Sequence, residues 1–212
     1  MKIETFPVGA FQENAYLVID ETKGEAVLID PGAEPERLIA AVEKSNAALK
    51  AMWITHAHID HVGAIAGVKR KWPVPVYLHP LDITLYRHAH TQAALYNLPF
   101  DDPPPPDAEL ADGDTLEVGA LRFDVAHVPG HAPGHVMIHG NGVAFVGDCL
   151  FAGSVGRTDL PGSNGGHLSR SLEKITALDP ATVLYPGHGP ATTVGEELRS
   201  NPFLNGTARI LA

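Results

Sequence analysis

The chain has 212 residues, of which 44% are hydrophobic and 19% charged, and its formal net charge is −10 at pH 7. This length supports one compact domain over residues 1–212 but is too short for two ordinary domains. The negative charge disfavours nucleic acid and anionic membrane surfaces as partners. A single cysteine, Cys149, excludes an internal disulfide. Together with an N-terminus unlike a secretory signal and the lack of a membrane-spanning apolar stretch, it predicts a cytoplasmic protein.

The first half of the chain alternates short apolar runs with segments of helical spacing. Runs rich in β-branched and aliphatic residues predict strands at 16–19, 26–29, 51–54 and 74–78. Apolar residues at helical spacing predict helices over 35–46, 62–72 and 80–98. The segment 99–107 contains four consecutive prolines, Pro103 to Pro106, and is expected to be an extended surface loop because proline fits neither a helix interior nor a central strand.

The second half repeats this alternation. Strands are predicted at 116–118, 121–126, 136–138, 143–146 and 182–185, and a helix over 168–178. Strands with interleaved helices in both halves favour an α/β fold in which two sheets pack face to face under covering helices.

Histidine is unusually frequent, with 12 copies, and four metal-ligand residues gather directly after the strand that ends at Ile54. Side chains two apart in an extended segment point the same way, so His56 and His58 can bind one metal. Asp60 and His61, where the chain turns, can face a second. Chance would produce such a pattern in on the order of one chain of this composition in several hundred. Imidazole and carboxylate together suit zinc, iron or manganese.

Three more candidate ligands lie beside glycine at the ends of predicted strands: His131, Asp148 and His188. Glycine and proline allow the backbone to turn sharply and to present one side chain to a cleft. A buried aspartate at such a position is costly unless its charge is paired, and a metal ion would pair it.

The run from His56 to His61, together with His131, Asp148 and His188, resembles the full ligand set of the metallo-β-lactamase superfamily. The resemblance extends from about Asn14 to Pro202 and is greatest to single-domain hydroxyacylglutathione hydrolases of the glyoxalase II type. It implies a four-layer αββα sandwich, with two mixed β-sheets flanked by helices and the site at one edge of the sheets. It also implies that His56, His58 and His131 hold one metal, that Asp60, His61 and His188 hold a second, and that Asp148 bridges both.

The resemblance implies a binuclear hydrolase with two divalent ions, zinc foremost and iron or manganese as alternatives. The two ions would lower the pKa of a shared water and hold the resulting bridging hydroxide, with Asp60 orienting it as a catalytic residue alongside Asp148. The motifs contain no separate acid, and a thiolate, with a thiol pKa of about 8.5, needs protonation less than an amine does. The expected substrate is therefore a small thioester resembling hydroxyacylglutathione, or a lactone. An aspartate bridge disfavours β-lactams as the main substrate.

For two of the residues near the candidate ligands, Arg157 and Asp30, the sequence leaves two possible roles open. Arg157 can meet a substrate carboxylate bidentately or can pair with Asp159 to stiffen its loop. Asp30 can hydrogen-bond a ligand histidine or cap its turn, and His135 is expected to support the ligands without binding metal. Cys149 is expected to pack beneath the site, because the metal chemistry makes a thiol nucleophile redundant.

Other functions remain open at this stage. His56, His131 and Asp148 form the two-histidine, one-carboxylate set of mononuclear iron oxygenases, and the stretch from Gly156 to Asp159 resembles persulfide dioxygenases. A lactonase or a promiscuous hydrolase with weak β-lactamase activity is a second alternative, and a non-catalytic metal-binding module is a third. Two-domain glyoxalase II enzymes carry a C-terminal helical extension that contacts glutathione, whereas a short tail follows His188 here. The resemblance therefore leaves glutathione recognition, the acyl group and the oligomeric state undetermined.

Overall fold

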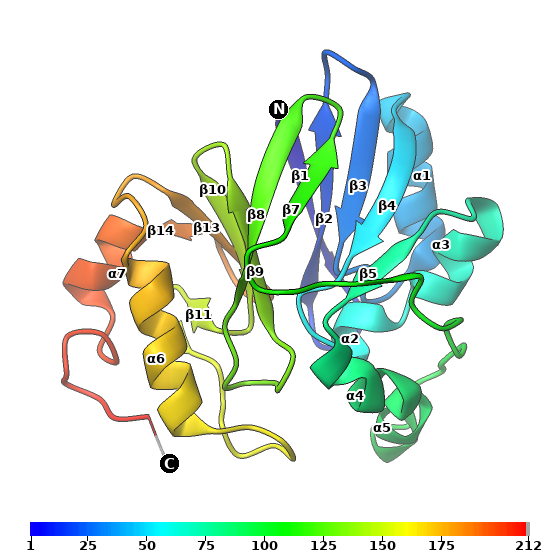
Figure 1. Ribbon diagram of the computed structural model, residues 1–212. Helices are drawn as coiled ribbons and strands as arrows, with labels where there is room; N and C mark the ends of the chain where they lie inside the picture. Colours follow the sequence, from blue (N-terminus) through cyan, green and yellow to red (C-terminus); the bar gives the residue numbers. More distant parts are fainter. Residues whose placement is uncertain (211–212) are drawn as a thin grey trace.

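The computed structural model describes residues 1–210 and contains two six-stranded sheets packed face to face, with helices on both outer faces (Figure 1). The first sheet has the order β1-β2-β3-β4-β5-β6 and the second has the order β14-β13-β10-β9-β8-β7. Both are mixed: β1, β2 and β3 are antiparallel while β3 to β6 are parallel, and in the second sheet only β10 and β13 are parallel. The predicted αββα sandwich is confirmed.

The first half of the chain forms the first sheet and the helices that cover it. Its strands are β1 (Lys2–Val8), β2 (Glu13–Asp20), β3 (Glu25–Ile29), β4 (Ala48–Trp53), β5 (Val76–Leu78) and β6 (Ala108–Glu109). Its helices are α1 (Pro35–Ser45), α2 (Ile59–Val62), α3 (Ile65–Lys71), a 3-10 turn η1 (Pro80–Asp82), α4 (Ile83–Arg87) and α5 (Ala89–Leu95).

The second half forms the other sheet. Its strands are β7 (Thr115–Val118), β8 (Leu121–His127), β9 (Val136–Gly140), β10 (Val143–Gly147), β13 (Val183–Pro186) and β14 (Thr192–Thr193). A two-stranded ribbon, β11 (Leu150–Phe151) and β12 (Ser154–Val155), follows β10, and the helices are α6 (Gly165–Thr176) and α7 (Val194–Ser200). None of the helices within residues 1–210 is long and apolar enough to cross a membrane.

Strand β2 explains how the layers are held together. All eight of its residues are buried, because one face meets the second sheet and the other meets the helices. Tyr16 and Val18 belong to the core between the sheets, which also contains Trp53, Phe123 and Phe145. The alternate residues of the strand pack in the core beneath α1 and α3. Full burial of each such side chain stabilises the fold by about 1.5–3 kcal/mol.

Two predicted helices are shorter than expected. The helix predicted over 62–72 is observed as α3, which begins at Ile65 after Gly63, where a Cβ would lie 2.4 Å from the carbonyl oxygen of Gly32. The short helix α2 before it was not predicted. The helix predicted over 80–98 becomes η1, α4 and α5, with a break at His88, whose Nδ1 bonds the carbonyl of Thr84 at 2.8 Å. Strand β14 and helix α7 are elements that the apolar pattern did not predict.

The proline-rich segment 99–107 lacks regular structure, as expected. The carbonyl of Pro104 accepts a hydrogen bond from the Tyr86 hydroxyl at 2.8 Å, which ties the segment to α4. Three of its prolines line a small hollow beside Tyr86 and Arg87. The segment then enters the first sheet as β6, which pairs with β5.

Candidate metal centre

The candidate ligands meet at one edge of the sandwich because each follows the end of a strand (Figure 1). His56 and His58 follow β4, and Asp60 and His61 lie in the short helix α2 directly after them. The second sheet supplies the others: His131 lies in the turn between β8 and β9, Asp148 follows β10, and His188 follows β13. Parallel pairing of β10 with β13 brings the last two ligand segments side by side.

Asp148 lies at the centre of this cluster. Its Oδ1 is 3.5 Å from His61 Nε2, and its Oδ2 is 3.5 Å from His131 Nε2 and 3.6 Å from His188 Nε2. On either side of it, His58 Nδ1 lies 2.9 Å from His131 Nε2, and His188 Nε2 lies 3.2 Å from Asp60 Oδ2. One carboxylate thus faces two groups of imidazoles.

The seven candidate residues form three overlapping groups whose ligand atoms lie within 4.8 Å of one another. These groups are His56 with His58 and His131, Asp60 with His61 and His188, and His56 with His61 and Asp148. The first two contain the residues expected for a first and a second metal. The third crosses between them and includes the aspartate expected to bridge.

Unpaired polar atoms show that this cluster fits metal ions. Within residues 1–210, His56 Nε2, His61 Nε2 and Asp148 Oδ1 are buried without a hydrogen-bond partner. Each buried polar atom left in this state costs about 1–3 kcal/mol. Two imidazole nitrogens and a carboxylate oxygen converging at one point are the donors that zinc, iron and manganese prefer.

Hydrogen bonds to the opposite ring nitrogens aim the imidazoles at the cluster. His131 Nδ1 donates to the carbonyl oxygen of Arg157 at 2.9 Å, which directs Nε2 into the cluster as the ligand atom. His61 Nδ1 lies 3.1 Å from Asp30 Oδ2, and His56 Nδ1 lies 3.2 Å from Thr55 Oγ1. Such partners fix both the tautomer and the orientation of a ligand ring.

Burial and mutual proximity determine the charges of the cluster. Burial, reinforced by neighbouring histidines, lowers the pKa of His58 to about 3 and the pKa of His56 well below its usual value. Burial alone would raise the pKa of Asp148, but His61 and His131 outweigh it and hold that pKa below its usual range. Burial also acts to lower the pKa of His61 and of His188, but Asp148 and Asp60 outweigh it and raise the pKa of both. Metal ions would therefore meet His56 and His58 as neutral imidazoles and would displace protons from His61 and His188.

Asp30 and His135 make the contacts of supporting residues. Asp30 Oδ1 accepts a hydrogen bond from Thr55 N at 2.7 Å, and its Oδ2 accepts one from Thr55 Oγ1 at 2.6 Å in addition to facing His61. His135 Nε2 accepts the backbone N–H of Asp148 at 3.0 Å, and its ring stacks on His56 with centroids 4.6 Å apart.

Two buried carboxylates near the cluster were missed by sequence reasoning. Glu13 is fully buried, and its Oε1 lies 3.8 Å from His61 Nδ1. Asp82 is also fully buried; it accepts Ala57 N at 3.0 Å with Oδ2 and Gly134 N at 2.5 Å with Oδ1. Asp82 thus joins the two loops that carry His56, His58 and His131. A lone aspartate whose partners are distant backbone groups leaves no pattern in the sequence.

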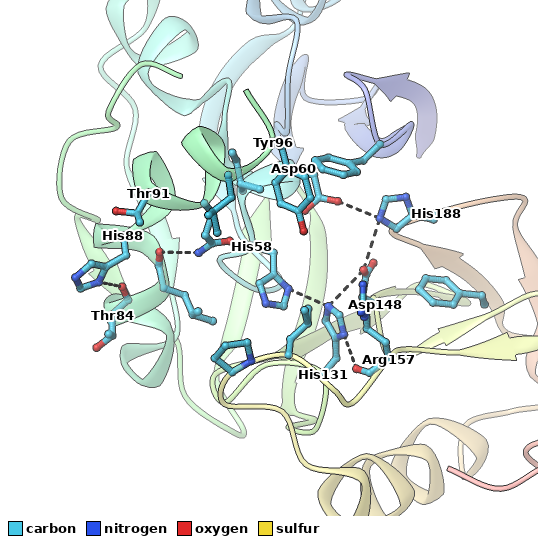
Figure 2. Close-up of a pocket in the computed structure, with 18 of the residues that line it drawn as sticks. His58, Asp60, Thr84, His88, Thr91, Tyr96, His131, Asp148, Arg157 and His188 are labelled. Carbon is cyan, nitrogen blue, oxygen red and sulfur yellow. Dashed lines mark hydrogen bonds and ion pairs between the residues drawn. The ribbon is translucent and has the colours of Figure 1, made fainter. Parts of the chain in front are cut away.

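The cluster lies at the floor of a cavity of about 720 Å³ (Figure 2). Five candidate ligands reach this cavity: His58, Asp60, His131, Asp148 and His188. Its walls come from α4 and α5, from Phe11 in the turn after β1, and from the segment that follows Asp148. The α4 and α5 wall, which includes Thr84, His88, Thr91, Gln92, Leu95 and Tyr96, was read from the sequence only as helix. No sequence motif marks this wall. In the structure it is distinguished by the exposure of an apolar residue, Leu95, which is 77% exposed.

Other expected residues are placed as follows. Arg157 lines the cavity, and its Nε and Nη2 donate to Asp159 at 2.6 and 2.7 Å, so the structure has the loop-stiffening pair. Cys149 is buried and donates to the Val128 carbonyl at 3.2 Å, and burial raises the pKa of its thiol, as expected for a packing residue.

Of the remaining histidines, His88 lines the cavity from the turn between α4 and α5. His79 and His167 are not among the residues that line it. His79 is buried and stacks on His127 with centroids 4.3 Å apart, while His167 is exposed in the first turn of α6.

Comparison with known proteins identifies relatives that match nearly the whole chain. The family model described as the metallo-beta-lactamase superfamily matches residues 8–188. The chain is 41% identical to the hydroxyacylglutathione hydrolase GloC of Haemophilus influenzae over 210 residues, which cover 97% of this chain and 99% of that protein.

Solved structures are similar over nearly the whole chain. TTHA1623 in a di-iron-bound form has a TM-score of 0.89 and 46% identity, covering 95% of this chain and all of that one. The B3 metallo-beta-lactamase BLEG-1 has a TM-score of 0.90 and 38% identity, covering 97% and 100%. ETHE1 from Myxococcus xanthus has a TM-score of 0.83 and 27% identity, covering 97% and 85%.

Proposed function

This chain belongs to the metallo-beta-lactamase superfamily, and from that premise we propose that it is a two-metal thioester hydrolase of the glyoxalase II type. Its substrates would be small thioesters resembling hydroxyacylglutathione. The first metal would be held by His56, His58 and His131, and the second by Asp60, His61 and His188, with Asp148 shared.

The observation that carries the proposal is the position of Asp148 between two complete groups of ligand residues. Its Oδ1 lies 3.5 Å from His61 Nε2, and its Oδ2 lies 3.5 Å from His131 Nε2 and 3.6 Å from His188 Nε2, so this one carboxylate faces both groups. A mononuclear centre would use one group and leave the other without a function. The second group also contains His61, which is fully buried and has an unpaired Nε2.

When bound, two divalent cations supply Lewis acidity and lower the pKa of water towards neutrality. The chain's own residues then position the reactants. Asp60, whose Oδ2 lies 3.2 Å from His188, is placed at the cavity floor to accept a hydrogen bond from the attacking water. The cavity walls hold the thioester with its carbonyl above Asp148 and limit access of bulk water.

The nature of the leaving group follows from the residues at the floor. The titratable side chains of the ligand cluster would be occupied by metal, and the others that line the cavity, His88, Tyr96 and Arg157, belong to the turns beside α5 and the segment after Asp148. A leaving group that departs as an anion suits such a site, and a thiolate does so more readily than an amine. The GloC relative, which is named a hydroxyacylglutathione hydrolase, supports the same substrate class. Zinc is the metal we propose first, with iron as the alternative that the di-iron TTHA1623 supports.

Elemental analysis of the purified chain, combined with hydrolysis of S-lactoylglutathione, tests the proposal. We expect close to two metal ions per chain and rapid turnover that a chelator abolishes and added metal restores. His188→Ala should reduce the metal content to about one and lower turnover, because His188 belongs only to the second group. Full activity with one metal per chain would contradict the two-metal mechanism.

Two other functions have specific support. The first is a mononuclear iron dioxygenase: His56 and His131 share one ligand group, and Asp148 Oδ2 lies 3.5 Å from His131 Nε2, which offers two histidines and one carboxylate. Oxygen uptake with glutathione persulfide would reveal this activity, and the same assay of ETHE1, which is similar to this chain, provides a comparison. Similarity to BLEG-1 counts against the expectation that β-lactams are poor substrates. Comparison of nitrocefin, a simple lactone and S-lactoylglutathione as substrates of one metal-replete preparation would rank these activities.

A further inference from the structure

A second cavity adjoins the candidate metal centre. It has a volume of about 610 Å³, within the range of about 300–1,000 Å³ typical of small-molecule sites. It lies between the turn after β1, the loop that leads into α1, helix α2 and the segment 98–101. Phe11, Ile59 and Asp60 line both this cavity and the central one. The second cavity is therefore reached from the Asp60 end of the candidate metal centre.

A pair of aromatic rings marks the boundary between the two cavities. Phe11 and Tyr96 are 5.0 Å apart between ring centroids and meet edge to face at 86°. Both are partly exposed, at 36% and 52%, and neither lies within a helix or strand. Exposed aromatic side chains in loops change rotamer on the picosecond-to-nanosecond scale, so this boundary can open to a ligand.

The second cavity is lined mainly by hydrocarbon. Its apolar residues are Val8, Ala10, Phe11, Ala33, Pro35, Ile59, Leu98, Pro99 and Phe100. Among the described residues that line it there is no lysine, arginine or histidine.

Besides Asp60, three carboxylates line this cavity, and all three are exposed at its rim: Glu34, Glu36 and Asp101. Two of them have partners. Glu34 accepts the backbone N–H of Gly9 at 2.9 Å and pairs with Arg37 at 3.0 Å, and Asp101 pairs with Arg70. The interior therefore favours an uncharged apolar group and offers no cation to a carboxylate.

The central cavity differs in character. Thr84, His88, Thr91 and Gln92 give it hydrogen-bonding groups along α4 and α5, and Arg157 lies across from them. In Figure 2 the α4 and α5 side chains lie on one side of His58, and His188 lies on the other. A polar, carboxylate-bearing arm of a substrate finds suitable partners here and finds none in the second cavity.

A thioester has two arms that meet at one carbonyl, and the two cavities meet at Asp60. We propose that the second cavity binds the acyl chain of an apolar, medium-chain thioester, while the polar thiol arm lies in the central cavity along α4 and α5. This inference rests on the proposed thioesterase function and names the acyl class of its substrate. It predicts preference for acyl groups longer and more apolar than lactoyl.

Binding of thioethers that cannot be hydrolysed tests the cavity without turnover. Calorimetry with S-octylglutathione and S-methylglutathione measures what the alkyl chain contributes. Each methylene removed from water strengthens binding by up to about fourfold. We therefore expect the octyl compound to bind at least about tenfold more tightly than the methyl compound.

Ala10→Trp provides the decisive variant, because Ala10 is exposed in a turn and its side chain borders only the second of these two cavities. It should abolish the advantage of the octyl compound and leave binding of the methyl compound unchanged. Ala120→Trp is the matched control, since Ala120 is exposed in the β7–β8 turn, far from α2 and α5 (Figure 1). It should bind both compounds like the parent chain.

Turnover of S-acetyl-, S-lactoyl- and S-octanoylglutathione separates this inference from the proposed function. A kcat/KM that rises with chain length, with the rise lost in Ala10→Trp alone, supports it. Hydrolysis of all three with equal kcat/KM, or octyl binding that Ala10→Trp leaves intact, would overturn the inference and leave the thioesterase standing. Hydrolysis of none by the metal-replete chain would overturn both.

Discussion

Asp82 links the two loops that carry three of the candidate ligands, and its environment predicts a measurable effect of pH on stability. The carboxylate is fully buried and accepts two backbone N–H groups, from Ala57 and Gly134. Burial raises its pKa from 3.8 to about 6, despite the opposing effect of those two hydrogen bonds. The folded state thus binds the proton of Asp82 more tightly than the unfolded state does.

The direction of the effect follows from that difference. Because the pKa of Asp82 is raised on folding, its contribution to stability is fully present below its unfolded pKa of 3.8 and is lost as pH rises through about 6. A shift of about two units corresponds to about 3 kcal/mol. Roughly 2 kcal/mol of this falls between pH 4.5 and 7.5. Asp82→Asn retains the size of the side chain but does not titrate, and should therefore lack this component.

Urea unfolding of the parent chain and of Asp82→Asn, both treated with chelator, at pH 4.5 and pH 7.5 measures the component. Other titrating groups are common to both proteins and cancel in the difference between their unfolding free energies. We expect the advantage of the parent chain over the variant to be larger at pH 4.5 by about 2 kcal/mol. A difference that is constant with pH would refute the argument that Asp82 is held in a protonation-sensitive environment.

The remaining predictions concern the ligand cluster and a contact remote from it, between Asp20 at the end of β2 and Ala120 in the β7–β8 turn. Asp148→Ala should lose both metals and all turnover, and elemental analysis showing two metals in an active variant would rule out the shared-ligand assignment. Asp30→Ala should weaken metal binding by about 10–100-fold, measured by competition with a chelator, because His61 loses the partner that orients its ring. Asp20→Ala should lower stability and leave the metal content unchanged, since Asp20 accepts the N–H of Ala120 at 2.7 Å, far along the chain. That hydrogen bond, with others from Thr22, lowers the pKa of Asp20 to about 2. The stabilisation by Asp20 is therefore present above its unfolded pKa near 3.8 and is lost as pH falls through about 2. Acid denaturation of the variant with the same pH dependence as that of the parent chain would contradict this.

The layered fold and the ligand cluster could be predicted because both leave local patterns in the sequence. The second half of β4 is a short, buried apolar run, and the ligands His56 and His58 follow it within a few residues. The ends of parallel strands meet at one edge of a sheet, so ligands at strand ends converge even when far apart in sequence. Asp148 and His188 illustrate this, because β10 and β13 are parallel neighbours.

Features that depend on tertiary contacts left no such pattern. Gly63, just before α3, lies so close to Gly32 of another loop that a Cβ would be 2.4 Å from its carbonyl oxygen, and periodicity does not report such a contact. The predicted helix 80–98 is interrupted at His88, and residues of both resulting helices, α4 and α5, line the cavity. Leu95 and Tyr96 look like ordinary helix residues in the sequence and become exposed rim residues in the structure.

The two kinds of feature have different roles in function. The metal centre is built on strand ends, where the backbone is fixed by sheet hydrogen bonds and by the loop-to-loop contacts of Asp82 and Asp30. The cavity walls are built on short helices and turns that rest on fewer buried contacts, and these determine which molecule reaches the centre. Substitutions in the short helices and turns of the cavity walls can therefore change which substrate binds without changing the ligand residues at the strand ends. Relatives with similar ligand clusters can therefore differ in substrate through the turn at Phe11 and through α4 and α5, and the binding experiment with Ala10→Trp probes one of these elements directly.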